Sequence, residues 1–267
     1  MHTTNRSTHS RNLPRSPGAR HGVPPAAPPA PGWGRGGPIL ILLAALLAAL
    51  LATACGIPQY VFLAPPVLSS VTALPPTASF THDELNDIDS FSGYELYYKF
   101  YDPAEGNVEE AFAADRSAIE EARPGSVVTT LGTRGYRRVY AADSSGPPAL
   151  RLTGEQRDEA FTVSIDFPDS AASTADAFAS WESTEGPRTV VLLRDQAALD
   201  NPTDPVRFTP SDIRADDADT PNPLPSGGTV EMGLVITAYG TDYLTGTFSE
   251  LYSTAVVADQ LLGVSYQ

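Results

Sequence analysis

The chain has 267 residues, one cysteine and a formal net charge of −15. Charge of this sign argues against binding nucleic acid or anionic lipid through a general positive field. A single cysteine cannot form a disulfide within the chain, so the fold must depend on an apolar core. With 42% hydrophobic residues, the sequence is long enough to form one large or two small domains.

The N-terminal region combines a basic polar stretch with a short apolar run. Residues 1–38 are rich in proline, glycine, serine and arginine, so we expect them to be disordered, or the start codon to be placed too far upstream. Residues 39–54 contain no charge, and Thr53 is their only polar side chain. Sixteen helical residues rise about 24 Å, which is short for a bilayer span. The pattern therefore predicts a signal peptide.

The run ends in Ala52-Thr53-Ala54-Cys55, which resembles the lipobox of bacterial lipoproteins. This resemblance implies that the Cys55 thiol receives a diacylglycerol and that residues 1–54 are then removed. Residues 55–63 become the lipid anchor and a short tether, and acyl chains provide stable membrane attachment at ~0.8 kcal/mol per buried CH₂ group. The implied location is the bacterial cell envelope, with the outer membrane or periplasmic face favoured. A plain membrane helix and a signal peptide cut elsewhere are the alternatives.

Short apolar segments that are separated by Gly, Pro, Asp and Ser predict β-strands along most of the remaining chain. The clearest is Tyr94–Tyr101, whose even-numbered and odd-numbered residues lie on opposite faces. We expect the odd-numbered Tyr97 and Tyr101 to be buried beneath neighbouring elements rather than exposed as contact residues. The other predicted strands are 67–71, 77–82, 127–131, 136–141, 149–152, 161–167, 189–193, 233–240 and 254–258, with 249–253 as the link between the last two.

Three segments do not read as strands. Apolar residues recur at helical spacing within 104–123, and Pro124-Gly125 follows them, so this segment predicts a helix. Trp181 lies in a segment that we interpret as helical or a turn. Residues 195–228 carry many prolines and acidic residues and read as mostly loop.

The two ends of the predicted β region resemble the fibronectin type III sandwich, an immunoglobulin-like fold. Residues 92–98, Ser-Gly-Tyr-Glu-Leu-Tyr-Tyr, are similar to its third strand, and residues 235–253 to its last two strands. The resemblance implies a mainly β sandwich built from 64–101 and 229–267. A large α+β insertion, 102–228, with one clear helix and a loop-rich part at 195–228, interrupts it. In the alternative, one larger mixed domain, strands of the insertion extend the sandwich sheets.

The sequence offers few candidates for catalysis or metal binding. His82 is the only histidine after Cys55, so we expect a structural or surface role rather than a catalytic triad or zinc site. The acidic clusters at 83–89 and 212–219 lack the spacing of a calcium loop and read as solvated loops. The glutamate pairs at 109–110 and 120–121 fall mostly on the exposed side of the predicted helix. We therefore name no catalytic, metal or cofactor residue, and Cys55 is the one predicted modification site.

These observations favour a non-enzymatic lipoprotein that acts as a binding or scaffolding module on a membrane surface. Its predicted partners are the membrane, through lipid on Cys55, and an envelope or extracellular protein, with no nucleic acid. An envelope hydrolase that uses acidic residues of the insertion is the first alternative, and it requires two carboxylates that converge in one cleft. A carrier or sensor for an apolar ligand is the second, and it requires an enclosed apolar pocket.

Overall fold

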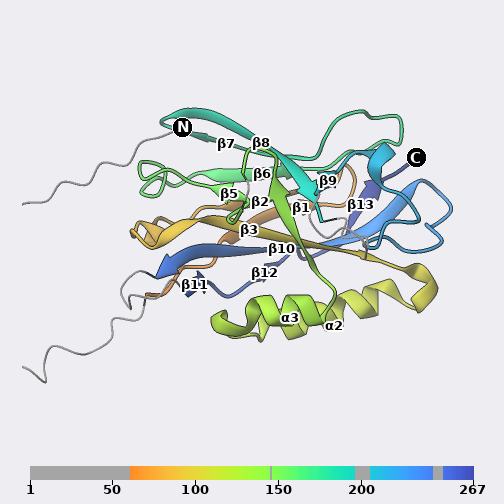
Figure 1. The fold of residues 1–267 in the computed structure, drawn as a ribbon, viewed down its shortest axis with the longest axis horizontal. Helices are drawn as coiled ribbons and strands as arrows, with labels where there is room; N and C mark the ends of the chain where they lie inside the picture. Colours follow the sequence, from red (N-terminus) through yellow and green to blue (C-terminus); the bar gives the residue numbers. More distant parts are fainter. Residues whose placement is uncertain (1–60, 145, 196–204, 243–248) are drawn as a thin grey trace, which may run out of the picture. The chain divides into compact units, whose positions relative to one another are not determined.

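The computed structural model describes residues 61–144, 146–195, 205–242 and 249–267. Residues 60–267 form a compact unit of their own, which is mainly β with two α-helices in its described part (Figure 1). No helix among the described residues is long and apolar enough to cross a membrane. The helices are α2 (Val108–Glu120) and α3 (Val127–Thr133), and four 3₁₀ turns are η1 (Glu84–Asn86), η2 (Pro103–Glu105), η3 (Pro124–Ser126) and η4 (Pro210–Asp212). The strands are β1 (Val67–Thr72), β2 (Thr77–Thr81), β3 (Phe91–Tyr101), β4 (Arg137–Ala141), β5 (Leu150–Arg151), β6 (Thr162–Asp166), β7 (Phe178–Ser183), β8 (Gly186–Arg194), β9 (Val206–Arg207), β10 (Thr229–Asp242), β11 (Ser249–Tyr252), β12 (Val256–Val257) and β13 (Leu262–Ser265).

All described strand pairs are antiparallel and belong to one continuous sheet. The strands follow the order β1-β2-β6-β7-β8-β4-β3-β10-β11, while β12 and β13 also pair with β10, β5 with β3, and β9 with β8. Residues 186–191 of β8 pair with β7, and residues 192–194 pair with β4. Strand β8 therefore joins a first strand group (β1, β2, β6 and β7) to a second strand group (β3, β4, β5 and β10–β13).

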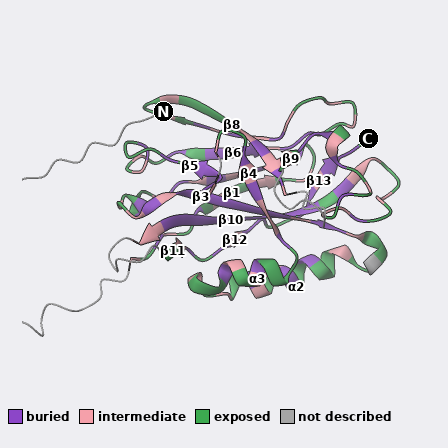
Figure 2. Cartoon of the chain, viewed as in Figure 1, coloured by how far each residue is buried: buried purple, intermediate pink, exposed green. Residues whose placement is uncertain are grey.

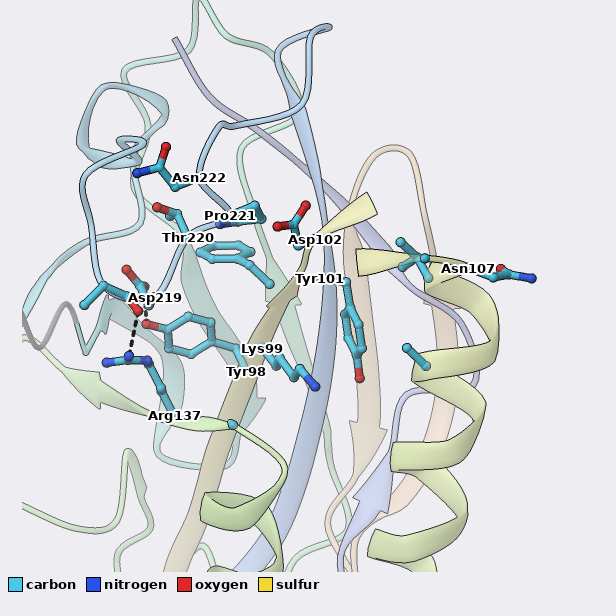
Figure 3. Close-up of a pocket in the computed structure, with 16 residues that line it drawn as sticks. Tyr98, Lys99, Tyr101, Asp102, Asn107, Arg137, Asp219, Thr220, Pro221 and Asn222 are labelled. Atoms are coloured by element: carbon cyan, nitrogen blue, oxygen red, sulfur yellow. Dashed lines mark hydrogen bonds between the residues drawn. The ribbon is translucent and has the colours of Figure 1, made fainter. Parts of the chain in front are cut away.

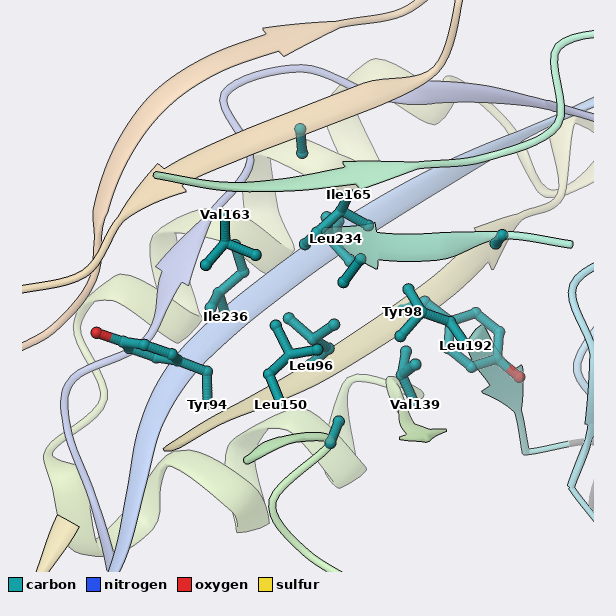
Figure 4. Close-up of a cluster of buried hydrophobic side chains, with 14 of the residues drawn as sticks. Tyr94, Leu96, Tyr98, Val139, Leu150, Val163, Ile165, Leu192, Leu234 and Ile236 are labelled. Atoms are coloured by element: carbon teal, nitrogen blue, oxygen red, sulfur yellow. The ribbon is translucent and has the colours of Figure 1, made fainter. Parts of the chain in front are cut away.

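Side chains from both strand groups meet in one large apolar cluster, which we call the inner core (Figure 4). Strand β3 contributes the even-numbered residues of the predicted strand, which are at most 7% exposed. The alternation predicted for residues 94–101 is therefore confirmed. The inner core includes Tyr94, Leu96, Tyr98 and Phe100 from β3, Val163 and Ile165 from β6, Leu192 from β8, and Leu234 and Ile236 from β10.

The opposite face of β3 and β10 is covered by the two helices, and their shared apolar cluster is the helix-side core (Figure 2). Tyr97 and Tyr101 are each 3% exposed there, which confirms their expected burial. The helices contribute Phe112 and Ile119 of α2 and Val127 and Leu131 of α3, and the other members are Tyr136, Val235, Ala255, Val257 and Leu261. Figure 1 shows α2 and α3 on the side of β10 that faces away from β6, β7 and β8.

The structure corrects three sequence predictions. Residues 127–131 form part of helix α3, not a strand, because Val127 and Leu131 are four residues apart and share one helical face in the helix-side core. Trp181 lies in strand β7, where it pairs with Val163 and Arg188, and not in a helix or turn. Residues 249–252 form strand β11 against β10 instead of a simple connection.

The strands β4, β5 and β6 of the segment 102–228 pair with the preceding part of the chain, residues 64–101. Strand β6 pairs with β2, and strands β4 and β5 pair with β3. Within the described part of 195–228, the regular elements are the two-residue β9 and the turn η4, so that part is loop-rich as expected.

Candidate functional site

A cleft of about 510 Å³ opens at the C-terminal end of β3 (Figure 3). Its volume lies within the usual range of ligand pockets, roughly 300–1,000 Å³. Its three walls are residues 98–102 at the end of β3, the start of α2, and the loop 218–222, and Gly135 and Arg137 line it as well. These segments are far apart in sequence, so the fold creates the cleft.

The first wall is the end of β3. Strand β4 pairs with β3 only at Tyr97 and Tyr98, whereas β10 pairs with β3 as far as Tyr101. Asp102 then turns the chain away, because its Oδ1 accepts a hydrogen bond from Ala104 N (2.8 Å) and Pro103 cannot donate one. Residues 99–101 consequently pair on the β10 edge only, among the residues that the structure describes.

The second wall is held in place by a buried polar cluster beneath α2. Asp115 of α2 is 5% exposed, and its Oδ2 accepts bonds from Lys99 Nζ (2.6 Å) and Tyr101 Oη (3.0 Å). Tyr136 Oη lies 2.9 Å from Tyr101 Oη and completes the chain. Burial raises the pKa of both tyrosines, so both hydroxyls stay protonated as donors. These bonds fix the position of α2 relative to β3.

The third wall is held by Arg194, whose side chain is fully buried at the end of β8. Its Nη1 donates to both oxygens of Asp219, at 2.6 and 2.9 Å, and its Nη2 donates to Asp217 Oδ2 and to the carbonyl of Asp212. Burial alone would lower the pKa of Arg194, but the two carboxylates raise it. The cluster at 212–219 was expected to be solvated. That expectation is wrong for Asp217 and Asp219, whose side chains are each 1% exposed.

Tyr98 and Arg137 connect this cluster to the cleft. Tyr98 Oη lies 2.6 Å from Asp219 Oδ2 and donates to it, and burial raises its pKa well above the usual value. Arg137 donates to the carbonyls of Ala218 (2.8 Å) and Asp195 (3.4 Å). Among the described residues, no carboxylate lies within ion-pair distance of Arg137. The guanidinium therefore brings a positive charge to the cleft.

The other candidate residues from the sequence lie outside the cleft, either buried in the fold or exposed on its surface. His82 is 1% exposed, with Nδ1 2.5 Å from Tyr94 Oη and Nε2 2.9 Å from the Arg157 carbonyl, and it stacks on Phe91 and Phe161. His82 is therefore buried within the fold and does not lie at its surface. In the acidic cluster 83–89, Asn86 is buried and bonds both the N–H and the carbonyl of Ala64. The glutamates at 109–110 and 120–121 are exposed on their helix, as expected.

A second buried polar group lies on the helix-side face of β3, away from the cleft. Glu95 is fully buried, and Arg138 Nε lies 3.1 Å from its Oε2. Their alignment does not make a hydrogen bond, so neither oxygen of Glu95 has a hydrogen-bond partner among the described residues. Burial raises the pKa of Glu95 to about 7, although the charge of Arg138 opposes the rise. Nothing in the local sequence signals this burial, apart from the alternation that places Glu95 beside Tyr97.

Within the described ranges, no group of three or more His, Cys, Asp or Glu side chains is arranged to hold a metal ion. Cys55, the predicted lipid-attachment residue, lies outside those ranges. No protein-family model, curated protein or solved structure matches the chain.

Proposed function

We propose that the chain is a bacterial cell-envelope lipoprotein that binds a partner, without catalysis, in the cleft at the end of β3. The observation that carries the proposal is the cleft itself, whose walls are fixed by the bonds of Asp115 and Arg194. Side chains that are locked by buried hydrogen bonds lose little entropy on binding, which favours recognition. The lipid on Cys55 would hold this cleft at a membrane surface.

The cleft supports binding better than the two alternatives. A hydrolase of this kind needs two carboxylates free to react in one cleft. Of the two aspartates that line this cleft, Asp219 is already bonded to Arg194 and Tyr98, which leaves Asp102 alone. An apolar carrier needs an enclosed apolar cavity, whereas this cleft is open and lined by Lys99, Arg137 and other polar groups.

We also propose that the fold is an immunoglobulin-like sandwich that has been enlarged by β7 and β8. The strand order β1-β2-β6 corresponds to the first, second and fifth strands of that fold, and the order β4-β3-β10-β11 corresponds to its other sheet. The inner core between the two strand groups supports the same interpretation. A solved structure that showed another connectivity would overturn it.

Photo-crosslinking in intact cells tests binding at the cleft. A photoreactive phenylalanine analogue in place of Asn222, which is exposed at the cleft, should give a discrete covalent adduct. The same analogue in place of Arg188, which is exposed on β8, serves as the matched control. Equal crosslinking patterns from the two positions, or no adduct from Asn222, would refute the proposed site.

The lipid anchor has its own test. Cys55→Ser should release the protein from membranes and abolish its labelling by a palmitate analogue. If the variant stays with the membrane and the unaltered protein takes no label, a plain membrane helix replaces the lipid in this proposal.

A further inference from the structure

The end of β3 exposes backbone groups inside the cleft. Ala238 N and Leu234 O form hydrogen bonds with residues 253–258. The backbone N–H and carbonyl groups of even-numbered residues of β10 therefore point away from β3, and those of odd-numbered residues point toward it. The register pairs Gly233 with Lys99 and Val235 with Tyr97, so the backbone N–H and carbonyl groups of odd-numbered residues of β3 point toward β10. The N–H and carbonyl of Phe100 therefore point to the other edge, which β4 leaves after Tyr98.

No described residue hydrogen-bonds the Phe100 backbone on this edge. Exposed strand edges tend to pair with other chains, and proteins usually protect them. Here the edge is recessed between α2 and the loop 218–222, so a sheet cannot reach it but a single extended segment can (Figure 3). Residues 99–101 span about 10 Å, enough for roughly three residues of such a segment.

We propose that the cleft binds an extended peptide segment, which adds as a short antiparallel strand to the open edge of β3 and places an acidic side chain against Arg137. Strand addition of this kind takes affinity from main-chain hydrogen bonds and specificity from alternate side chains. The proposal rests on the proposed binding function and specifies its ligand.

The two faces of β3 determine the side-chain preference. Arg137 pairs with Tyr98, so its side chain lies on the inner face of the sheet, and a peptide residue paired with Phe100 lies on that face too. A carboxylate there lies in line with Arg137 on the same edge and the same face, about 7 Å along it, and can form a charge-assisted hydrogen bond with it. The flanking peptide residues point to the other face, where Val108 and Ala111 of α2 line the cleft. The preferred pattern is therefore apolar–acidic–apolar.

A fluorescent Thr-Val-Glu-Val-Thr pentapeptide amide tests the proposal against the full-length chain in detergent by fluorescence anisotropy. Methylating the glutamate nitrogen removes the N–H that faces Phe100, and it should weaken binding about tenfold or more. Methylating the following valine nitrogen alters an N–H that faces away, so binding should stay within about threefold. Equal effects of the two methylations, or no saturable binding of the parent peptide, would overturn the proposal.

Arg137→Gln tests the charge. It should weaken binding of the glutamate peptide about tenfold but leave a glutamine analogue of the peptide nearly unaffected, and Arg137→Lys should retain part of the affinity. Arg188→Gln, an exposed arginine on β8, is the matched control and should change neither affinity. In ¹⁵N-phenylalanine spectra, the peptide should protect the Phe100 amide from exchange. An unprotected Phe100 amide in the saturated complex would also reject strand addition.

The crosslinking experiment separates two kinds of failure. If Asn222 yields its specific adduct but the pentapeptide fails these tests, the cleft binds a ligand of another kind and only the peptide inference is lost. If neither result is obtained, the binding function at this cleft is lost as well.

Discussion

Replacement of Arg194 by methionine should destabilise the protein strongly. The arginine side chain is fully buried, and the two carboxylates that it bonds are each 1% exposed. Methionine fills similar space but leaves Asp217 and Asp219 without this cation and the Asp212 carbonyl without its donor. Removing one partner from a buried ionic cluster typically costs about 3–5 kcal/mol. For a folded unit of this size, that corresponds to a melting temperature lower by roughly 6–20 °C.

Urea unfolding followed by circular dichroism measures this cost directly. Arg207→Met is the matched control, because Arg207 also pairs with an aspartate, Asp176, but is 63% exposed. An exposed pair contributes about 1 kcal/mol at most. The loss of unfolding free energy in Asp219→Asn should fall between those of the two variants, since Arg194 keeps Asp217 as a charged partner. If the unfolding free energy of Arg194→Met lies within about 0.5 kcal/mol of that of the unaltered protein, the Arg194 charge is solvated and does not hold the loop 218–222 in place.

Three further changes test other parts of the structure. Because the folded pKa of Glu95 is about 7 and its ordinary value is 4.5, the folded state holds the extra proton between them, so stability should fall by roughly 3 kcal/mol as pH rises from about 4 to 8. Glu95→Gln should flatten that slope in urea unfolding across pH, and an unchanged slope would contradict the burial of a titrating carboxyl. Gly233→Ala should lower the melting temperature, since the added Cβ would lie 2.8 Å from Tyr136 Oη; an unchanged value would mean that α2 packs more loosely. Ile119→Ala should cost about 2–5 kcal/mol in the same urea assay, because Ile119 is fully buried, and a loss below about 1 kcal/mol would contradict the helix-side core.

Sequence patterns predicted elements well where both faces of a segment carried a consistent signal. The alternation in residues 94–101 is visible in the sequence, and it anticipated the inner core and the burial of Tyr97 and Tyr101. Residues 127–131 misled because Val, Val, Thr and Thr favour strands locally. Tertiary packing overrode that preference, because a helix lets Val127 and Leu131 cover the same part of the helix-side core.

The candidate site was much harder to predict. Arg194 ends one strand, and its partners Asp217 and Asp219 lie more than twenty residues later in a polar stretch. A charged residue in such a stretch normally faces water, and no sequence period reports that an arginine from another strand will meet it. No sequence pattern predicts the open edge of β3 either, because that edge arises where β4 stops pairing with β3. Local patterns describe single elements, whereas this cleft depends on where three separate elements end.

The cleft follows from the way β3 is covered. Over most of its length, β3 has the inner core on one face, the helix-side core on the other, and strands on both edges. Beyond Tyr98 one edge loses this cover, because β4 has turned away, and α2 begins only at Val108. Unpaired main-chain groups and charged side chains then share a small space whose walls are held by Asp115 and Arg194. Such a space presents backbone donors and acceptors together with a cation before any ligand arrives. An extended acidic segment satisfies all of these groups at once, and for that reason a peptide fits this cleft better than a small apolar molecule does.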